Sequence, residues 1–226
     1  MSTLIAEDLL LLLLDDRKGT LTGVAPIQTV LGGAVLAELA LTEHVVVSEK
    51  TGVWKKAKVR PSGAPPPDDP VLREALEKVA EKERAADDLV DRLGKGLKDR
   101  LAERLAEAGI LERREGKVLG LFPRTRWPEA DATHERDVRR ALTSALVQGL
   151  SPDARTATLI ALLSAIDRPH KAVDHEGMPA RAVKKRAKEI AKGDWAAKAV
   201  KDAIAASTTA VVTVTAAAGA VGSTGS

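Results

Sequence analysis

The sequence feature that most constrains the fold is a short apolar run between acidic residues. Leu9–Leu14 is an unbroken row of leucines, with Glu7-Asp8 before it and Asp15-Asp16 after it. A helix that spans a bilayer needs about 20 apolar residues, and a secretory signal has positive charge before its apolar stretch. The run therefore predicts a helix over residues 4–14 that is buried on all sides of a water-soluble protein.

The composition favours helices. Apolar residues make up 44% of the 226 residues but aromatic residues only 2%, so Leu, Val, Ile and Ala must fill the core. The absence of Cys excludes disulfides, thiolate metal sites and cysteine nucleophiles. A net charge of +3 permits an anionic partner but identifies none.

Apolar residues at helical spacing recur along the chain. Pro26 and Pro70 each suit the first turn of a helix, and Ser151 with Pro152 is typical of a cap followed by a first turn. The pair Gly32-Gly33 indicates that another backbone approaches the second helix closely. The further predicted helices cover residues 26–41, 70–79, 97–108, 138–146, 152–166, 180–192 and 195–206.

Two β-structures are predicted. Strands at 45–47 and 53–59 flank a turn at 50–52, and a hairpin joins 110–111 to 118–122 through a turn at Glu115-Gly116. The last twenty or so residues contain only Ala, Val, Thr, Gly and Ser. We therefore expect a single domain over 1–206 and a disordered tail over 207–226.

Patterns that carry catalysis are missing from the sequence. There is no Gly-x-Ser-x-Gly elbow, and Gly32-Gly33 lacks the Lys-Ser/Thr of a phosphate-binding loop. The histidines are not spaced as a helical metal pair; they are His44, His134, His170 and His175. We expect no catalytic residue, no metal site, no cofactor and no enzymatic activity.

Basic residues are more informative. Lys95 and Lys98 are three apart at the start of a predicted helix and are expected to share one face, where free N–H groups and the helix dipole favour an anion. Arg92 and Arg100 are candidate additional contacts. Because aspartates are interleaved with these residues, a solvated surface of mixed charge is the alternative.

A second basic cluster lies within 180–192. Its members are Arg181, Lys184, Lys185, Arg186 and Lys188. The segment lacks a large apolar face for deep membrane insertion. It is expected to be an electrostatic contact surface or a solvated helix.

Several segments together resemble the Golgi phosphoprotein 3 family. They are LLLLDDRKG at 11–19, LGGAVLAELA at 31–40, DPVLREAL at 69–76, DRLA at 99–102 through GIL at 109–111, and DARTATLIAL at 153–162. Their order and spacing carry the resemblance, which covers about 5–204. The composition, rich in Ala, Arg and Val, indicates a bacterial-type member.

The resemblance implies a mainly α-helical fold, in which amphipathic helices surround a helical bundle and a β-hairpin projects. Eukaryotic members are peripheral membrane proteins that recognise phosphatidylinositol 4-phosphate and act as adaptors for Golgi glycosyltransferases. Their head-group pocket uses a Trp and an Arg near the second helix and two basic residues three apart. Lys95 and Lys98 match the basic pair, Leu31 replaces the Arg, and the loop 19–26 holds no aromatic residue.

The hairpin is the second family feature, used for membrane insertion or self-association. Its expected membrane-facing residues are Val118, Leu119, Leu121 and Phe122. Arg124, Arg126 and Trp127 follow, and Trp beside Arg suits a membrane interface. The alternative is that alternate hairpin residues pack on the helices.

The expected function is therefore a cytoplasmic, peripheral protein that binds anionic phospholipid head groups on the cytosolic face of a membrane, with a protein client if it acts as an adaptor. One alternative is a winged-helix-like nucleic-acid-binding module, because a helix followed by a hairpin is also that pattern. The helix 97–108 alternates Arg with acidic residues, which a duplex would repel, so no nucleic acid is expected. The other alternative is a protein–protein adaptor without lipid binding.

Overall fold

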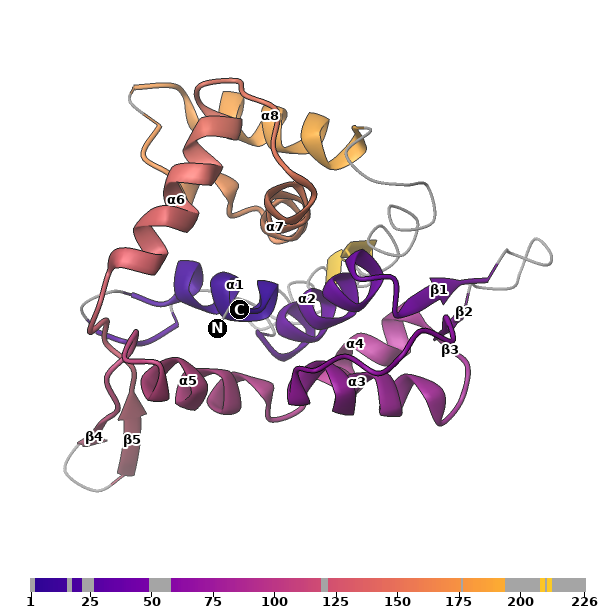
Figure 1. The fold of residues 1–226 in the computed structure, drawn as a ribbon. Coiled ribbons are helices and arrows are strands. Elements are labelled where there is room, and N and C mark those ends of the chain that lie inside the picture. The colour runs from indigo at the N-terminus through magenta and orange to yellow at the C-terminus, as the bar shows by residue number, and fades with distance from the viewer. Residues whose placement is uncertain are drawn as a thin grey trace, which may run out of the picture.

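The computed structural model describes residues 3–15, 18–21, 27–48, 58–118, 122–175, 177–193, 208–209 and 211–212. The predicted mainly helical fold is confirmed, with small antiparallel sheets that include a hairpin (Figure 1). The helices are α1 (Ile5–Leu13), α2 (Ile27–Leu41), α3 (Pro70–Ala80), α4 (Ala86–Gly94), α5 (Leu97–Glu107), α6 (Thr133–Leu146), α7 (Ala154–Ala165), η1 (Pro169–Lys171) and α8 (Ala180–Lys192). The strands are β1 (Val45–Val47), β2 (Lys58–Pro61), β3 (Arg84–Ala85), β4 (Arg114–Val118) and β5 (Phe122–Arg126).

Helix α1 lies at the centre of the fold. Every residue of α1 is buried, its two acidic residues included, which confirms the prediction from the leucine run. It packs against α2, α5, α6 and α7. In Figure 1, α1 and α2 form a middle layer between α3, α4 and α5 on one side and α6, α7 and α8 on the other. No helix in the described part of the chain is long and apolar enough to cross a bilayer.

Helices α2 and α4 cross at two glycines. A Cβ added at Gly32 would lie 1.8 Å from the carbonyl oxygen of Val90, and one added at Gly94 would lie 1.8 Å from that of Gln28. Both distances are shorter than any real contact, so each helix needs a residue without a side chain here. The predicted close approach of a backbone to the second helix is confirmed at Gly32. This crossing holds the end of α4, and with it the start of α5, against the beginning of α2.

The hairpin differs from its predicted register. Strands β4 and β5 pair Arg114 with Arg126 and Val118 with Phe122, so Glu115 and Gly116 lie within β4 and the predicted turn there is wrong. The first strand begins later because Ile110 and Leu111 complete the helix end, where both amides donate to Leu105 O.

The starts of α3 and α7 are set by capping residues, and one predicted cap is wrong. Asp69 caps α3 through its side chain, with Pro70 in the first turn as predicted. The cap of α7 is Asp153 rather than Ser151, because the Asp153 carboxylate accepts a hydrogen bond from Thr156 N at 2.7 Å. A carboxylate at this position also suits the positive end of the helix dipole.

Several predictions fall on residues outside the described part. They are Pro26, the turn at 50–52 and the helix 195–206. Within the expected tail, residues 208–209 and 211–212 are described; they are helical and Val211 is fully buried. The domain boundary and the disorder of the remaining tail stay predictions.

Candidate anion-binding site

A cavity of about 560 Å³ lies where the turn after α1, the first half of α5 and the base of the hairpin meet. We call it the α5–hairpin pocket. Its lining residues are Gly19, Thr20, Leu21, Lys98, Asp99, Glu103, Arg113, Thr125 and Trp127. Because this lining is mostly polar and charged, the pocket suits a polar ligand.

Gly19 joins the turn after α1 to the base of the hairpin. It has a φ of +59°, in the left-handed region that favours glycine, and its carbonyl accepts a hydrogen bond from Trp127 N at 3.0 Å. A Cβ at Gly19 would lie 2.2 Å from Pro128 N. The turn itself is closed by Asp15, whose side chain accepts from Lys18 N at 2.7 Å. Local turn chemistry therefore builds one wall of the pocket.

Trp127 supplies an unsatisfied hydrogen-bond donor. The residue is 3% exposed, and its buried indole Nε1 has no hydrogen-bond partner among the described residues. A buried donor without an acceptor is costly and rare in native proteins. The expected membrane-interface role of Trp127 is wrong, because the ring is buried; the residue instead lines the pocket.

Two cations line the same pocket. Lys98 is the second residue of α5, and its Nζ lies 3.4 Å from Asp99 Oδ1. The Arg113 guanidinium lies 3.9 Å from Glu103 and 3.0 Å from Glu115. The lining therefore contains two cations and two carboxylates, whose formal charges cancel.

Lys95 does not share this pocket. It follows the end of α4 in extended conformation, and Gly96, with a φ of +71°, separates it from α5. The expectation that Lys95 and Lys98 lie on one helical face is therefore wrong, because Lys95 is not in the helix. Lys95 lines a separate cavity of about 40 Å³, together with Glu74 and Arg100.

The candidate additional contacts are already paired. Arg100 forms an ion pair with Glu74 of α3, and Arg92 lies 3.7 Å from Asp88 within α4. Leu31, which stands where the family has an Arg, is fully buried. Of the residues expected at an anion site, the structure therefore places only Lys98 in the α5–hairpin pocket.

Arg113 and Trp127 are the pocket residues that sequence reasoning missed. Arg113 lies between the end of α5 and β4, and Trp127 directly follows β5, so both stand at the base of the hairpin. The charge pattern of a single helix could not find them. The available signal was the combination of a hairpin with a lone Trp at its end, since a buried Trp N–H normally needs an acceptor.

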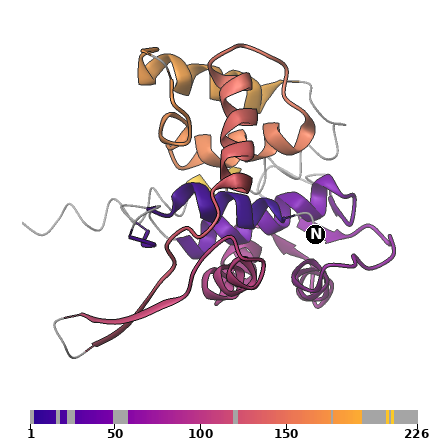
Figure 2. The same cartoon turned by 60° about the vertical axis from the view of Figure 1, so that its left-hand side comes forward.

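The hairpin projects away from the helices (Figure 2). The described residues of its strands are exposed: Arg114, Glu115, Gly116, Thr125 and Arg126. The backbones of Val118 and Phe122 pair at the distal end. Leu119 and Leu121, and the side chains of Val118 and Phe122, lie outside the described part, so their membrane-facing role stays a prediction.

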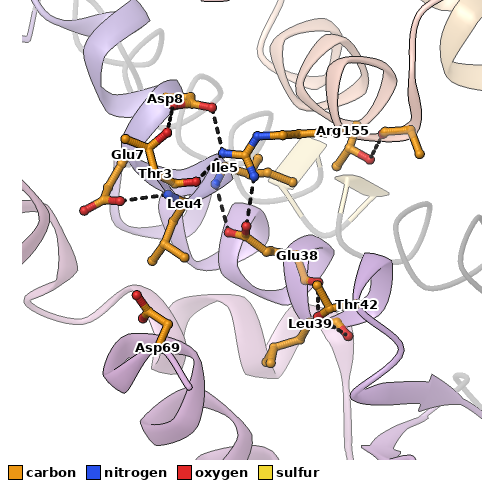
Figure 3. A network of polar contacts seen from close by, with 12 residues as sticks. Thr3, Leu4, Ile5, Glu7, Asp8, Glu38, Leu39, Thr42, Asp69 and Arg155 are labelled. Atoms are coloured by element: carbon orange, nitrogen blue, oxygen red, sulfur yellow. Dashed lines mark hydrogen bonds and ion pairs between the residues drawn. The ribbon is translucent and has the colours of Figure 1, made fainter. Parts of the chain in front are cut away.

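A second polar cluster is buried around α1 (Figure 3). Arg155 of α7 donates to Glu38 Oε1 at 3.0 Å and to Asp8 Oδ2 at 2.8 Å. Glu38 also accepts from Ile5 N at 2.8 Å, and His134 Nε2 lies 2.7 Å from Asp8 Oδ1. The cluster satisfies the buried acidic groups at the start of α1 and ties them to α2, α6 and α7.

Burial governs the protonation of these acids. It raises the pKa of Glu38 to about 6, although Arg155 opposes the shift. It also raises the pKa of Glu7, despite hydrogen bonding to Leu4 N and the nearby Arg104. A cavity of about 400 Å³ adjoins the cluster, with a mainly apolar lining that includes Asp8, His134 and Arg155. The geometry is that of a structural clamp. Among the described residues, no group of His, Asp and Glu could hold a metal ion.

The fold and the pocket define a mainly helical protein with a projecting hairpin and a polar ligand pocket at the hairpin base. The family model of Golgi phosphoprotein 3 (GPP34) matches residues 5–207. The chain belongs to the Golgi phosphoprotein 3 family, as the resemblance predicted. This family is non-enzymatic and is known for binding phosphatidylinositol 4-phosphate at Golgi membranes, which agrees with the expectation that the chain is not an enzyme. No curated protein matches the chain.

Proposed function

We propose that the protein binds anionic phospholipid head groups in the α5–hairpin pocket and thereby acts as a peripheral protein on the cytosolic face of a membrane. The observation that carries the proposal is one cavity lined by Lys98, Arg113 and Trp127, the last of which has a buried Nε1 without an acceptor among the described residues. A phosphate group accepts hydrogen bonds from all three donors, and Arg offers it a bidentate pair.

The carboxylates of the pocket favour a head group that also carries hydroxyls. Asp99 and Glu103 line the cavity beside the cations, and ionised carboxylates only accept hydrogen bonds. An inositol ring donates through its hydroxyls while its phosphate accepts. The cavity of about 560 Å³ is within the usual range for small ligands. A phosphoinositide therefore fits this lining better than a head group without hydroxyls, and phosphatidylinositol 4-phosphate is the family's lipid.

The surface around the pocket supports an orientation in which the pocket faces the membrane. Residues at the base of the hairpin line the pocket, and the hairpin projects outward from the helices (Figure 2). Its distal end carries the apolar sequence Val118 to Phe122. Insertion of this end would bring the pocket to the head-group layer, whereas self-association would use the same residues between two copies. Lys95, which is exposed and has no ion pair among the described residues, contributes surface charge. Each such cation contributes about 1 kcal/mol near an anionic surface.

Trp127 takes the place of the missing family residues in this proposal. The family's pocket Arg is Leu31 here and is buried, and its pocket Trp has no counterpart in the loop 19–26. Trp127 and Arg113 supply an aromatic donor and a guanidinium from the hairpin base instead. The pocket of this chain is therefore built differently, and the bacterial-type reading still rests on the composition rich in Ala, Arg and Val. Binding of a protein client, as an adaptor, is compatible with this function.

Liposome co-flotation tests the proposal. The vesicles contain phosphatidylcholine alone or with phosphatidylserine, phosphatidylinositol or phosphatidylinositol 4-phosphate at matched charge, at low and at physiological salt. Lys98→Gln removes a cation from the pocket, and Lys95→Gln is the matched control because Lys95 lines a different cavity.

Binding to the phosphorylated lipid above phosphatidylserine, lost in Lys98→Gln and weakened no more than about fivefold in Lys95→Gln, as expected for one surface cation, supports the pocket. Equal losses in both variants, or binding that follows surface charge alone, would reduce the protein to a generic anionic-membrane binder. No flotation at low salt would overturn the proposal in favour of an adaptor without lipid binding or of a nucleic-acid-binding module.

A further inference from the structure

Helix α8 concentrates the positive charge of the molecule. It contains six basic residues and one acidic residue, a net of +5, whereas the whole chain carries +3. The rest of the chain together therefore carries −2. A helix that alone exceeds the net charge of its protein is a strong local field for anions.

The basic residues of α8 are arranged in a stripe. Val183, Ala187 and Ile190 are buried against the fold. The basic side chains on the opposite side follow one another in steps of four, three and four residues, so they lie along one line of the helix. They are Arg181, Lys185, Lys188 and Lys192, and all four are exposed. This basic stripe covers about 16 Å of helix.

The stripe is poorly neutralised within the chain. Lys185, whose side chain is 80% exposed, lies 3.9 Å from Glu189. Arg181, Lys188 and Lys192 have no ion pair among the described residues. In contrast, Lys184 beside the stripe is paired with Asp167 at 2.5 Å. Outward cations without partners are available to an external anion.

We propose that the basic stripe of α8 is a docking surface for an acidic, extended segment of a partner protein. Two observations favour this occupant over a membrane. Carboxylates bound the stripe on both sides, Glu189 on one flank and Asp167 beside Lys184 on the other, and these are 53% and 69% exposed. A bilayer plane would press against those carboxylates, whereas a single acidic chain follows the line of cations.

The position of α8 is the second observation. In Figures 1 and 2, α8 lies at the end of the molecule opposite to α5 and the hairpin. A protein seated on a membrane through the α5–hairpin pocket would therefore point α8 into the water. This second argument rests on the proposed function, whereas the charge and geometry of the stripe do not.

Fluorescence anisotropy with a labelled octaglutamate peptide tests the docking surface, at low and at physiological salt. The stripe variant is Arg181→Gln/Lys185→Gln/Lys188→Gln/Lys192→Gln. The matched control is Lys58→Gln/Arg60→Gln/Lys82→Gln/Arg140→Gln, which removes the same charge from exposed residues elsewhere. Circular dichroism verifies that both variants are folded.

Because surface ion pairs are individually weak, all four cations of the stripe are replaced together. We expect peptide binding to weaken by about tenfold or more in the stripe variant and by less than about twofold in the control. Equal weakening in both variants, or no peptide binding at low salt, would overturn the proposal. Stripe-dependent binding of phosphatidylserine vesicles or of single-stranded RNA that exceeds binding of the peptide would overturn it in favour of those partners. Lys98→Gln separates the two proposals, because it should abolish flotation and leave peptide binding intact.

Discussion

Arg155 Nη1 lies 3.0 Å from Glu38 Oε1, and this ion pair joins α7 to the last turn of α2. The same guanidinium reaches Asp8 of α1 at 2.8 Å. Both carboxylates are almost completely buried, with side chains 8% and 5% exposed. One arginine therefore compensates two buried acids on two central helices.

Replacement of Arg155 by Met is expected to destabilise the protein strongly. It leaves Asp8 and Glu38 buried without their cation, and removal of one partner of a buried pair typically costs about 3–5 kcal/mol. Urea unfolding followed by circular dichroism measures the loss. Arg140→Met is the control, because the Arg140 side chain is 73% exposed in its pair with Asp137 and should cost less than about 1 kcal/mol. Similar small losses in both variants would contradict the clamp.

Glu38 is expected to make stability depend on pH. Its pKa is about 6 in the folded protein against an ordinary value of 4.5. The folded state therefore binds more protons than the unfolded state between these two pH values. The contribution of Glu38 protonation to the free energy of unfolding is present below pH 4.5 and is lost as the pH rises through 6. The difference corresponds to about 2 kcal/mol.

The variant Glu38→Gln cannot titrate at this position and isolates the effect. From pH 7 to pH 4.5, the wild type should gain about 2 kcal/mol of unfolding free energy relative to Glu38→Gln, measured by urea unfolding at each pH. Comparison with the variant cancels the contributions that the other acidic residues make to the pH dependence of stability. Parallel stability curves for the two proteins would show that Glu38 titrates normally.

Gly32→Ala should disrupt the crossing of α2 and α4. Its Cβ would lie 1.8 Å from Val90 O, so the helices must separate, and overpacking of this kind costs about 1–3 kcal/mol or more. Gly149→Ala is the comparison: Gly149 has a φ of +79° and open space around it, so only the left-handed backbone is penalised, by about 1–2 kcal/mol. Thermal unfolding of both variants gives the measurement. A stability of Gly32→Ala equal to the wild type would refute the close crossing.

Trp127→Phe tests the unsatisfied indole donor. It removes Nε1–H but keeps an aromatic ring, so the smaller side chain should cost about 1–2 kcal/mol of stability. Flotation with phosphatidylinositol 4-phosphate should fall several-fold, because a neutral hydrogen bond contributes about 1 kcal/mol. Isothermal titration with the soluble inositol phosphate head group gives the affinity. Unchanged affinity in a folded variant would remove Trp127 from the site.

Local elements were predictable where neighbouring residues decide them. The Asp69-Pro70 start of α3, the left-handed Gly19 and the extent of α8 each depend on side chains within one turn. The hairpin register was not, since Glu115-Gly116 is an acceptable turn in isolation. These two residues lie within β4 instead, because Leu111 is held by the hydrogen bond from its amide to Leu105 O and by a bridge with Glu129.

The sequence by itself determined that α1 is buried, that the protein is mainly helical and that it belongs to its family, because periodicity, capping and motif order are written along the chain. Only the tertiary structure decided the candidate site. Lys98 was found in the sequence, but Gly19, Arg113 and Trp127 come from distant segments, and Lys95 is separated from the pocket by one glycine turn. Helix packing brings such residues together or apart, and no local pattern encodes it.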